Sequence, residues 1–306
     1  MVPYCSVDHQ KADRPAHKLA CSRIKRCRED MQAKEKALRD APEGYFTHNV
    51  GVFWKIHETR PYMQARAAYT SALSNVFRYE TIGAQLDVLM GDLQLCRGDN
   101  MGSRELIPGL MIRLNKDQEC YDFLKWWATT NESRIYDWSD MSLPYLDIKD
   151  ANVLEPVDSF IKNSFDLPHL VMVTLLKIRV LWIIMAMIKP DTRTYLVEMT
   201  GMTGSNIINH SFVANCQNPW DESVKIKGQI RELYDAVNKI NAHFWPALVD
   251  PGDNLDVEAR LFMIGSKEQM QSTLRITWEA WSETFGAIDV IEQAVKGKKA
   301  PFSKDN

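Results

Sequence analysis

The most constraining feature of the sequence is a long apolar run, "LPHLVMVTLLKIRVLWIIMAMIKP", at residues 167 to 190. The run is long enough for a membrane-spanning helix, which needs about 20 consecutive apolar residues. His169, Lys177 and Arg179 lie inside it, however, and charged side chains are costly within a bilayer. We therefore predict a helix that is buried in a protein core, and we do not expect a membrane as a partner.

Most of the remaining chain repeats its apolar residues at helical spacing. Residues 63 to 95 place Ala, Tyr, Leu and Val three or four positions apart, and 117 to 130 form an amphipathic pattern. Alternating strand patterns bounded by turns are scarce. The predicted fold class is all-α, with stacked helical hairpins. The other expected segments are helices around 168 to 188, 222 to 242 and 267 to 296, and a polar connector at 137 to 150.

Tryptophan is abundant, with nine residues in 306. Aromatic side chains at helical spacing are more often core than ligand-binding. We therefore assign one group of tryptophans to the core: Trp126, Trp127, Trp138, Trp220, Trp245, Trp278 and Trp281.

Residues 22 to 40 mix both charges at helical spacing and contain neither Gly nor Pro. Glu29, Asp30 and Glu35 lie three or four positions from basic residues, which favours an exposed helix. The following "APEG" at 41 to 44 is expected to end it. We interpret the segment as a solvated connector.

The N-terminal stretch "YCSVDHQKADRPAHKLAC" carries Cys5, His9, His17 and Cys21. A Cys and a His four residues apart on a helix lie on one face, so each pair can hold part of a tetrahedral zinc site. The four side chains together are our candidate metal ligands, provided that the seven-residue gap folds back as a hairpin. Two alternatives stay open: Cys27 or a second chain completes the site, or the stretch is a pair of helices without metal.

This stretch resembles the C-terminal half of a MYND-type zinc finger, and the resemblance covers about 18 of the 306 residues. His9 stands where the family usually has Cys, and Arg14 and Pro15 fall where a Trp is expected. The complete finger binds two zinc ions with two further Cys-x2-Cys pairs upstream, so this chain alone holds only half of the ligands. We expect either an upstream segment or a vestigial finger. The matching residues are Tyr4, Cys5, Ser6, Gln10, His17, Lys18 and Cys21.

The segment after residue 97 is expected to be a turn between two helices, with Gly98 as a left-handed cap and Asp99 or Asn100 capping the next helix. It is similar to the Asp-Asn-x-Gly-x-Arg linkers of tetratricopeptide-like proteins, and Gly102 and Arg104 fit that pattern. No 34-residue period follows, so the expected stack is irregular. The body also resembles the region after MYND fingers in a group of uncharacterised fungal proteins. The predicted domains are a partial finger at 1–21, a connector at 22–44 and a helical body at 45–306.

One stretch favours an enzyme. "INHSFVANC" at 208 to 216 resembles the Asn-His-Ser-x-x-Pro-Asn-Cys signature of SET-domain lysine methyltransferases, in which Asn209 and His210 would meet S-adenosylmethionine. Ala214 replaces the Pro, no Gly-x-Gly strand is visible, and the SET fold consists of short strands. We treat the match as chance and keep the methyltransferase as the alternative function. No phosphate-binding loop or Ser-His-Asp elbow is visible.

The formal net charge of -3 gives no electrostatic case for nucleic acid as a whole-chain partner, so we do not expect a nucleic-acid partner. No secretory signal is apparent, so an intracellular location is expected, in cytoplasm or nucleus, with the cysteines reduced. The function that we expect is a non-enzymatic interaction, scaffolding or regulatory protein with a zinc site that is intact or vestigial. Its partner would be a protein or peptide, and a MYND finger implies Pro-containing peptides.

Overall fold

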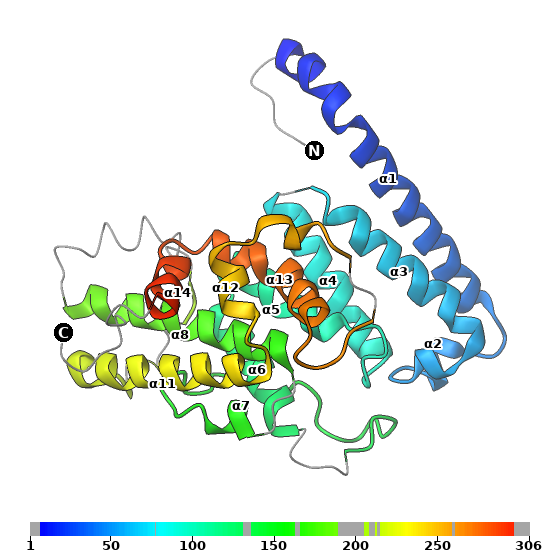
Figure 1. Ribbon diagram of the computed structural model, residues 1–306. Helices are drawn as coiled ribbons and strands as arrows, with labels where there is room; N and C mark the ends of the chain where they lie inside the picture. The colour runs from blue at the N-terminus through cyan, green and yellow to red at the C-terminus, as the bar shows by residue number, and fades with distance from the viewer. Residues whose placement is uncertain are drawn as a thin grey trace. The chain divides into compact units, whose positions relative to one another are not determined.

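The computed structural model describes residues 7–76, 78–130, 136–162, 166–188, 205–207, 212, 215–258 and 261–296. The chain divides into two compact units. Unit 1 comprises residues 1–104 and 137–142, and unit 2 comprises residues 105–136 and 143–306. Within the described ranges every regular element is a helix (Figure 1), so the all-α prediction is confirmed. Tetratricopeptide-like stacking stays a prediction.

Unit 1 is built on a long first helix. Its elements are α1 (Val7–Asp40), α2 (Tyr45–His48), the short 3-10 turns η1 (Phe53–Lys55) and η2 (His57–Thr59), α3 (Arg60–Leu73) and α4 (Tyr79–Leu95). α1 carries several ion pairs between residues four apart, such as Lys25 with Glu29 and Arg39 with Glu35. It ends at Asp40, and Gly44 takes a left-handed conformation. The predicted charged helix and its break are confirmed, and α1 continues without interruption from residue 7 through the boundary predicted after residue 21.

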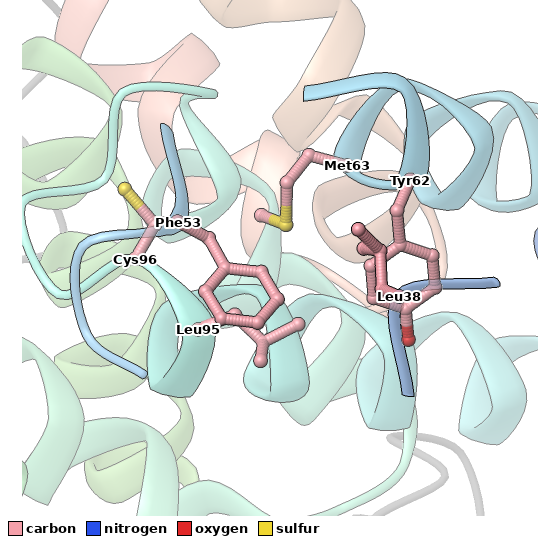
Figure 2. Packing of buried hydrophobic residues seen from close by; sticks show 6 residues of the cluster. All are labelled: Leu38, Phe53, Tyr62, Met63, Leu95 and Cys96. Atoms are coloured by element: carbon pink, nitrogen blue, oxygen red, sulfur yellow. The ribbon is translucent and has the colours of Figure 1, made fainter. Parts of the chain in front are cut away.

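The core of unit 1 collects apolar side chains from both ends of its sequence (Figure 2). Leu38 near the end of α1 meets Tyr62 and Met63 of α3, and Phe53 lies with Leu95 and Cys96 at the end of α4. All six side chains are at most 9% exposed. Burying a side chain of this size contributes about 1.5–3 kcal/mol, so this cluster fixes α1 to the rest of unit 1 through its C-terminal half.

A buried ion pair joins α3 to α4. The Arg66 guanidinium contacts the Asp92 carboxylate and also donates to Tyr62 Oη (3.0 Å) and to the Val88 carbonyl oxygen (2.6 Å). A Cβ atom on Gly91 would lie 2.5 Å from Arg66 Nη2, so only glycine lets the guanidinium lie this close to α4. The sequence did not predict this pair, because its members are 26 residues apart.

Unit 2 surrounds the apolar helix α8 (Leu167–Ile188), which packs against α6 (Asp117–Thr130), α11 (Pro219–Ile240), α13 (Lys267–Ser282) and α14 (Ala287–Val295). Among the described residues, α8 is one helix whose length and composition would allow a membrane crossing, and 78% of its apolar window is buried inside the protein. The prediction of a buried core helix is confirmed. The remaining elements are α5 (Ser103–Arg113), α7 (Asp158–Lys162), α12 (Phe244–Val249) and the 3-10 turn η5 (Gly252–Leu255).

Three sequence expectations need correction. The helix expected at 267–296 is two helices, because Gly286 takes a left-handed conformation (φ 71°) between α13 and α14. The left-handed residues in the turn before α5 are Asp99 (φ 49°) and Gly102 (φ 73°), and Gly98 is not left-handed. Trp220 is 61% exposed at the start of α11, whereas Trp126, Trp127, Trp245 and Trp281 are buried as predicted. Helical spacing alone does not show which face of a helix is covered.

The two cations of α8 are both buried and both paired. Lys177 Nζ donates to the carbonyl oxygens of Val153 (2.6 Å) and Glu155 (3.0 Å), and it is fully buried. Arg179 donates to Asp117 Oδ2 (3.0 Å) and to Asn115 Oδ1 (2.9 Å). A buried charge needs such partners, because its desolvation is otherwise costly.

Lys177 makes the stability of the protein depend on pH. Burial lowers the pKa of Lys177 from 10.5 to about 7, although Glu155 nearby opposes the change. Between pH 7 and 10.5 the unfolded chain therefore binds a proton that the folded chain lacks, so stability rises with pH across this window.

We expect the free energy of unfolding to increase by about 1 kcal/mol between pH 7 and pH 8. Lys177→Met should abolish this increase, because methionine does not titrate. Urea unfolding of both proteins at several pH values, followed by tryptophan fluorescence, measures the effect. The same slope in wild type and variant would show that Lys177 is not responsible.

Candidate interaction surface

The most unusual surface feature of unit 2 is a run of exposed apolar side chains between η5 and α13, in the orange part of Figure 1. Leu261 is 91% exposed, Phe262 46%, Met263 78% and Ile264 62%. We call these four residues the apolar tip. Single exposed apolar residues are ordinary, but a contiguous group of large ones is typical of a site that contacts a partner.

Buried amide side chains hold the C-terminal base of the tip. Asn241, which is 1% exposed at the end of α11, donates through Nδ2 to the Ser266 carbonyl oxygen (2.8 Å) and to Gln269 Oε1 (3.1 Å). Gln269 Oε1 also accepts from the Gly265 backbone N–H (2.8 Å). Ser266 Oγ accepts from the Gln269 N–H (3.2 Å) and caps α13. This network fixes the point at which the tip joins α13.

Gly265 is required at this base. Its φ of +81° lies in the left-handed region, and a Cβ atom would lie 3.2 Å from the Ile240 carbonyl oxygen. Other residues adopt such a conformation only with strain. The chain therefore turns sharply from the exposed tip into the buried base within one residue.

The N-terminal side of the loop is anchored in a similar way. Asn254 Nδ2 donates to the Pro251 carbonyl oxygen (2.9 Å), and the Asn254 Oδ1 atom accepts from Gln271 Nε2 (3.0 Å) of α13. Gln271 is itself buried. Both ends of the loop are thus bonded to the first two turns of α13, while Asp256, Val257 and the apolar tip between the anchors are exposed.

The surroundings of the apolar tip are acidic. Residues 250 to 268 contain five acidic and two basic residues. Asp253, Asp256 and Glu258 are exposed, and Glu258 pairs with Arg275 at 3.5 Å across the surface. A partner for this loop would therefore combine an apolar surface with basic groups, and an anionic lipid surface would be repelled.

The candidate zinc ligands are only partly described. Cys5 lies outside the described residues, and His9, His17 and Cys21 lie along α1, with Cys21 exposed. At a rise of about 1.5 Å per residue, the backbones of His9 and Cys21 are about 18 Å apart along a continuous helix. α1 does not contain the hairpin that a four-ligand site requires, and no group of three or more His, Cys, Asp or Glu side chains that could hold a metal lies in the described parts of the chain. The zinc site stays a prediction.

The methyltransferase signature gains no support. Asn209, His210 and Ala214 lie outside the described residues, while Phe212 and Cys216 are buried. The described ranges contain no strand, apart from one isolated bridge between Val52 and Cys96, whereas the SET fold consists of strands.

The turn between residue 97 and α5 has largely the structure that its sequence predicts. The Asp99 carboxylate accepts from the backbone N–H groups of Ser103 (2.8 Å) and Arg104 (3.0 Å), which caps α5. Burial raises the pKa of Asp99 to about 6, although these hydrogen bonds oppose the change. Asn100 accepts from Cys96 Sγ instead of capping the helix. Asp99 is therefore a structural residue.

Sequence reasoning missed the apolar tip. Four apolar residues before a Gly-Ser pair are the only local signal, and so short a run does not distinguish a buried segment from an exposed one. The anchors are amide side chains from two helices, and their convergence is visible only in the folded chain.

Removing one anchor should release the loop. Asn241→Ala removes two hydrogen bonds at the base of the tip, one to the Ser266 carbonyl oxygen and one to Gln269 Oε1, at a cost of about 2 kcal/mol. We expect faster tryptic cleavage after Lys267, at the start of α13, at the same protease concentration. Asn238→Ala is the matched control, since Asn238 is exposed on the same helix. Equal cleavage rates in both variants would contradict the anchoring role.

Comparison with known proteins does not assign this surface to a family. No protein-family model matches the chain, and no curated protein or solved structure is significantly similar to it.

Proposed function

We propose that this protein is an interaction module that binds a protein partner through the apolar tip of the 256–264 loop. The observation that carries the proposal is the combination of four consecutive exposed apolar side chains with a base that is bonded on both sides. Leaving these side chains in water forgoes the free energy of burial, about 1.5–3 kcal/mol for each large one. That free energy is recovered when a partner covers them.

The fixed base supports binding because it lowers the conformational entropy that the loop loses when it binds a partner. Ordering a free peptide on a partner costs conformational entropy for every residue that is immobilised. Here Asn241, Gln269 and Gln271 already hold the two ends of the loop, so less freedom is lost. A short loop with bulky apolar residues fits a concave apolar site on the partner, as anchor residues do in other interfaces.

The negative charges around the apolar tip indicate which charged groups the partner carries. Asp253, Asp256 and Glu258 favour basic groups at the rim of the partner's apolar site. The proposed partner is therefore a protein with an apolar groove bordered by lysine or arginine. A scaffolding or regulatory role is consistent with such a module.

A double variant, Leu261→Ser with Met263→Ser, tests the proposal. Both side chains are exposed, so the substitutions should change the free energy of unfolding by no more than about 0.5 kcal/mol. Binding of the partner should fall by about 100-fold, because two anchor contacts are removed. Tyr79→Ser with Val224→Ser is the matched control, since it removes two exposed apolar side chains elsewhere.

Partners are identified by quantitative mass spectrometry after purification from the cells that express the protein. Each candidate is then purified, and its affinity for wild type, double variant and control is measured by calorimetry. The proposal requires a partner whose affinity falls for the double variant and stays unchanged for the control. It fails if every co-purifying protein binds the double variant as well as the wild type.

A further inference from the structure

A second surface, in unit 1, is strongly basic although the whole chain is slightly acidic. Residues 18–28 of α1 contain no acidic residue and five basic ones: Lys18, Arg23, Lys25, Arg26 and Arg28. All five are exposed. Within the described part of the chain, Arg23, Arg26 and Arg28 form no ion pair, whereas Lys25 pairs with Glu29 at 3.7 Å. This stretch therefore concentrates uncompensated positive charge.

The helix that packs beside α1 adds no negative charge. Residues 60–79, which include all of α3, contain neither Asp nor Glu. The exposed positions of α3 are small or neutral, among them Gln64, Ala67, Ala68 and Ser71, and Arg78 is exposed just after it. α1 thus presents basic side chains beside a face of α3 that carries small or neutral ones. A bulky anion can approach this surface without meeting large side chains or negative charge on α3.

The length of α1 also matters. It has 34 residues, and α3 has 14, so the N-terminal part of α1 extends beyond α3 (Figure 1). Residues 18–28 cover about 15 Å along the helix axis. Successive residues point about 100° apart, so the five cations spread around the exposed arc of the helix rather than along one line. The partner must therefore carry repeated negative charges over a similar length.

We infer that the surface formed by residues 18–28 of α1 and the outer face of α3 binds the phosphate backbone of double-stranded DNA. Duplex DNA carries one negative charge for about every 1.7 Å of its axis, which provides several phosphates for this group of cations. Phosphate contacts of this kind need no apolar contribution. The surface offers Leu19 as its one large exposed apolar side chain among the described residues of these two segments.

The same observations argue against two other anionic partners. An amphipathic helix binds a membrane by inserting an apolar face, but Ala20, Ile24, Cys27 and Met31 of α1 are partly buried. An acidic protein surface usually requires an apolar centre for stable binding, and this face lacks one. The inference does not depend on the proposed function, because it concerns a different unit and different residues.

The test uses the full chain and a fluorescein-labelled 20-base-pair DNA duplex of arbitrary sequence, with binding measured by fluorescence anisotropy. If about four phosphates are contacted, the logarithm of the binding constant should fall with the logarithm of salt concentration with a slope near −4. Arg23→Glu with Arg26→Glu should weaken binding by at least about 10-fold and make the slope shallower by about 2.

The matched control is Lys36→Glu with Lys225→Glu. These lysines are 75% and 62% exposed and lie in local ion pairs, and the substitutions change the net charge by the same amount. The control should bind the duplex within about twofold of wild type. Circular dichroism verifies that both variants keep their helices.

Three results would overturn the inference. The first is no binding of the duplex at 50 mM salt. The second is an equal loss of DNA affinity in the Arg23 and Arg26 variant and in the Lys36 and Lys225 control, which would mean that only net charge matters. The third is that the protein does not bind DNA but sediments with vesicles containing phosphatidylserine, and that the Arg23 and Arg26 variant does not sediment with them. That result would assign the surface to a membrane.

Discussion

The burial of α8 is the constraint on which unit 2 depends. Lys177 and Arg179 are two residues apart, so their side chains leave the helix about 200° apart and reach different neighbours. Lys177 bonds to the carbonyl oxygens of Val153 and Glu155, while Arg179 reaches Asp117 at the start of α6. Any rotation of α8 about its axis would break one of these sets of bonds and leave a buried charge without partners. The two cations thus fix the orientation of the helix around which the others pack.

The candidate interaction surface follows from that packing. α11 and α13 both lie against α8, and the base of the loop is bonded to both, through Asn241 at the end of α11 and Gln269 in the first turn of α13. The core therefore positions two buried amides, and the amides position the exposed tip. Residues far from the surface determine how it is presented.

The sequence predicted the positions of helices better than it predicted which of their faces are buried and which residues they contact. The period of apolar residues predicted α6 and α8, because that pattern is a local property of the chain. It also predicted helical structure across residues 63–95, but not the break that divides this stretch into α3 and α4. Gly286 divided the last predicted helix, and the exposure of Trp220 was missed, since burial depends on which neighbours arrive. The anchors of the apolar tip could not be predicted, because Asn241 and Gln269 meet only after folding. Net charge was similarly uninformative, because a sum of -3 over the whole chain does not show the basic stretch of α1.

The central claim is that a rigid base presents an exposed apolar tip, and hydrogen–deuterium exchange of the full chain tests it most directly. The amides of Gly265 and Gln269 donate to side chains at the base, and that of Met270 donates to the Ser266 carbonyl. They should exchange many times more slowly than the amides of Leu261 and Phe262. Uniformly fast exchange from residue 256 to residue 270 would mean that the base is not fixed, and it would contradict the account.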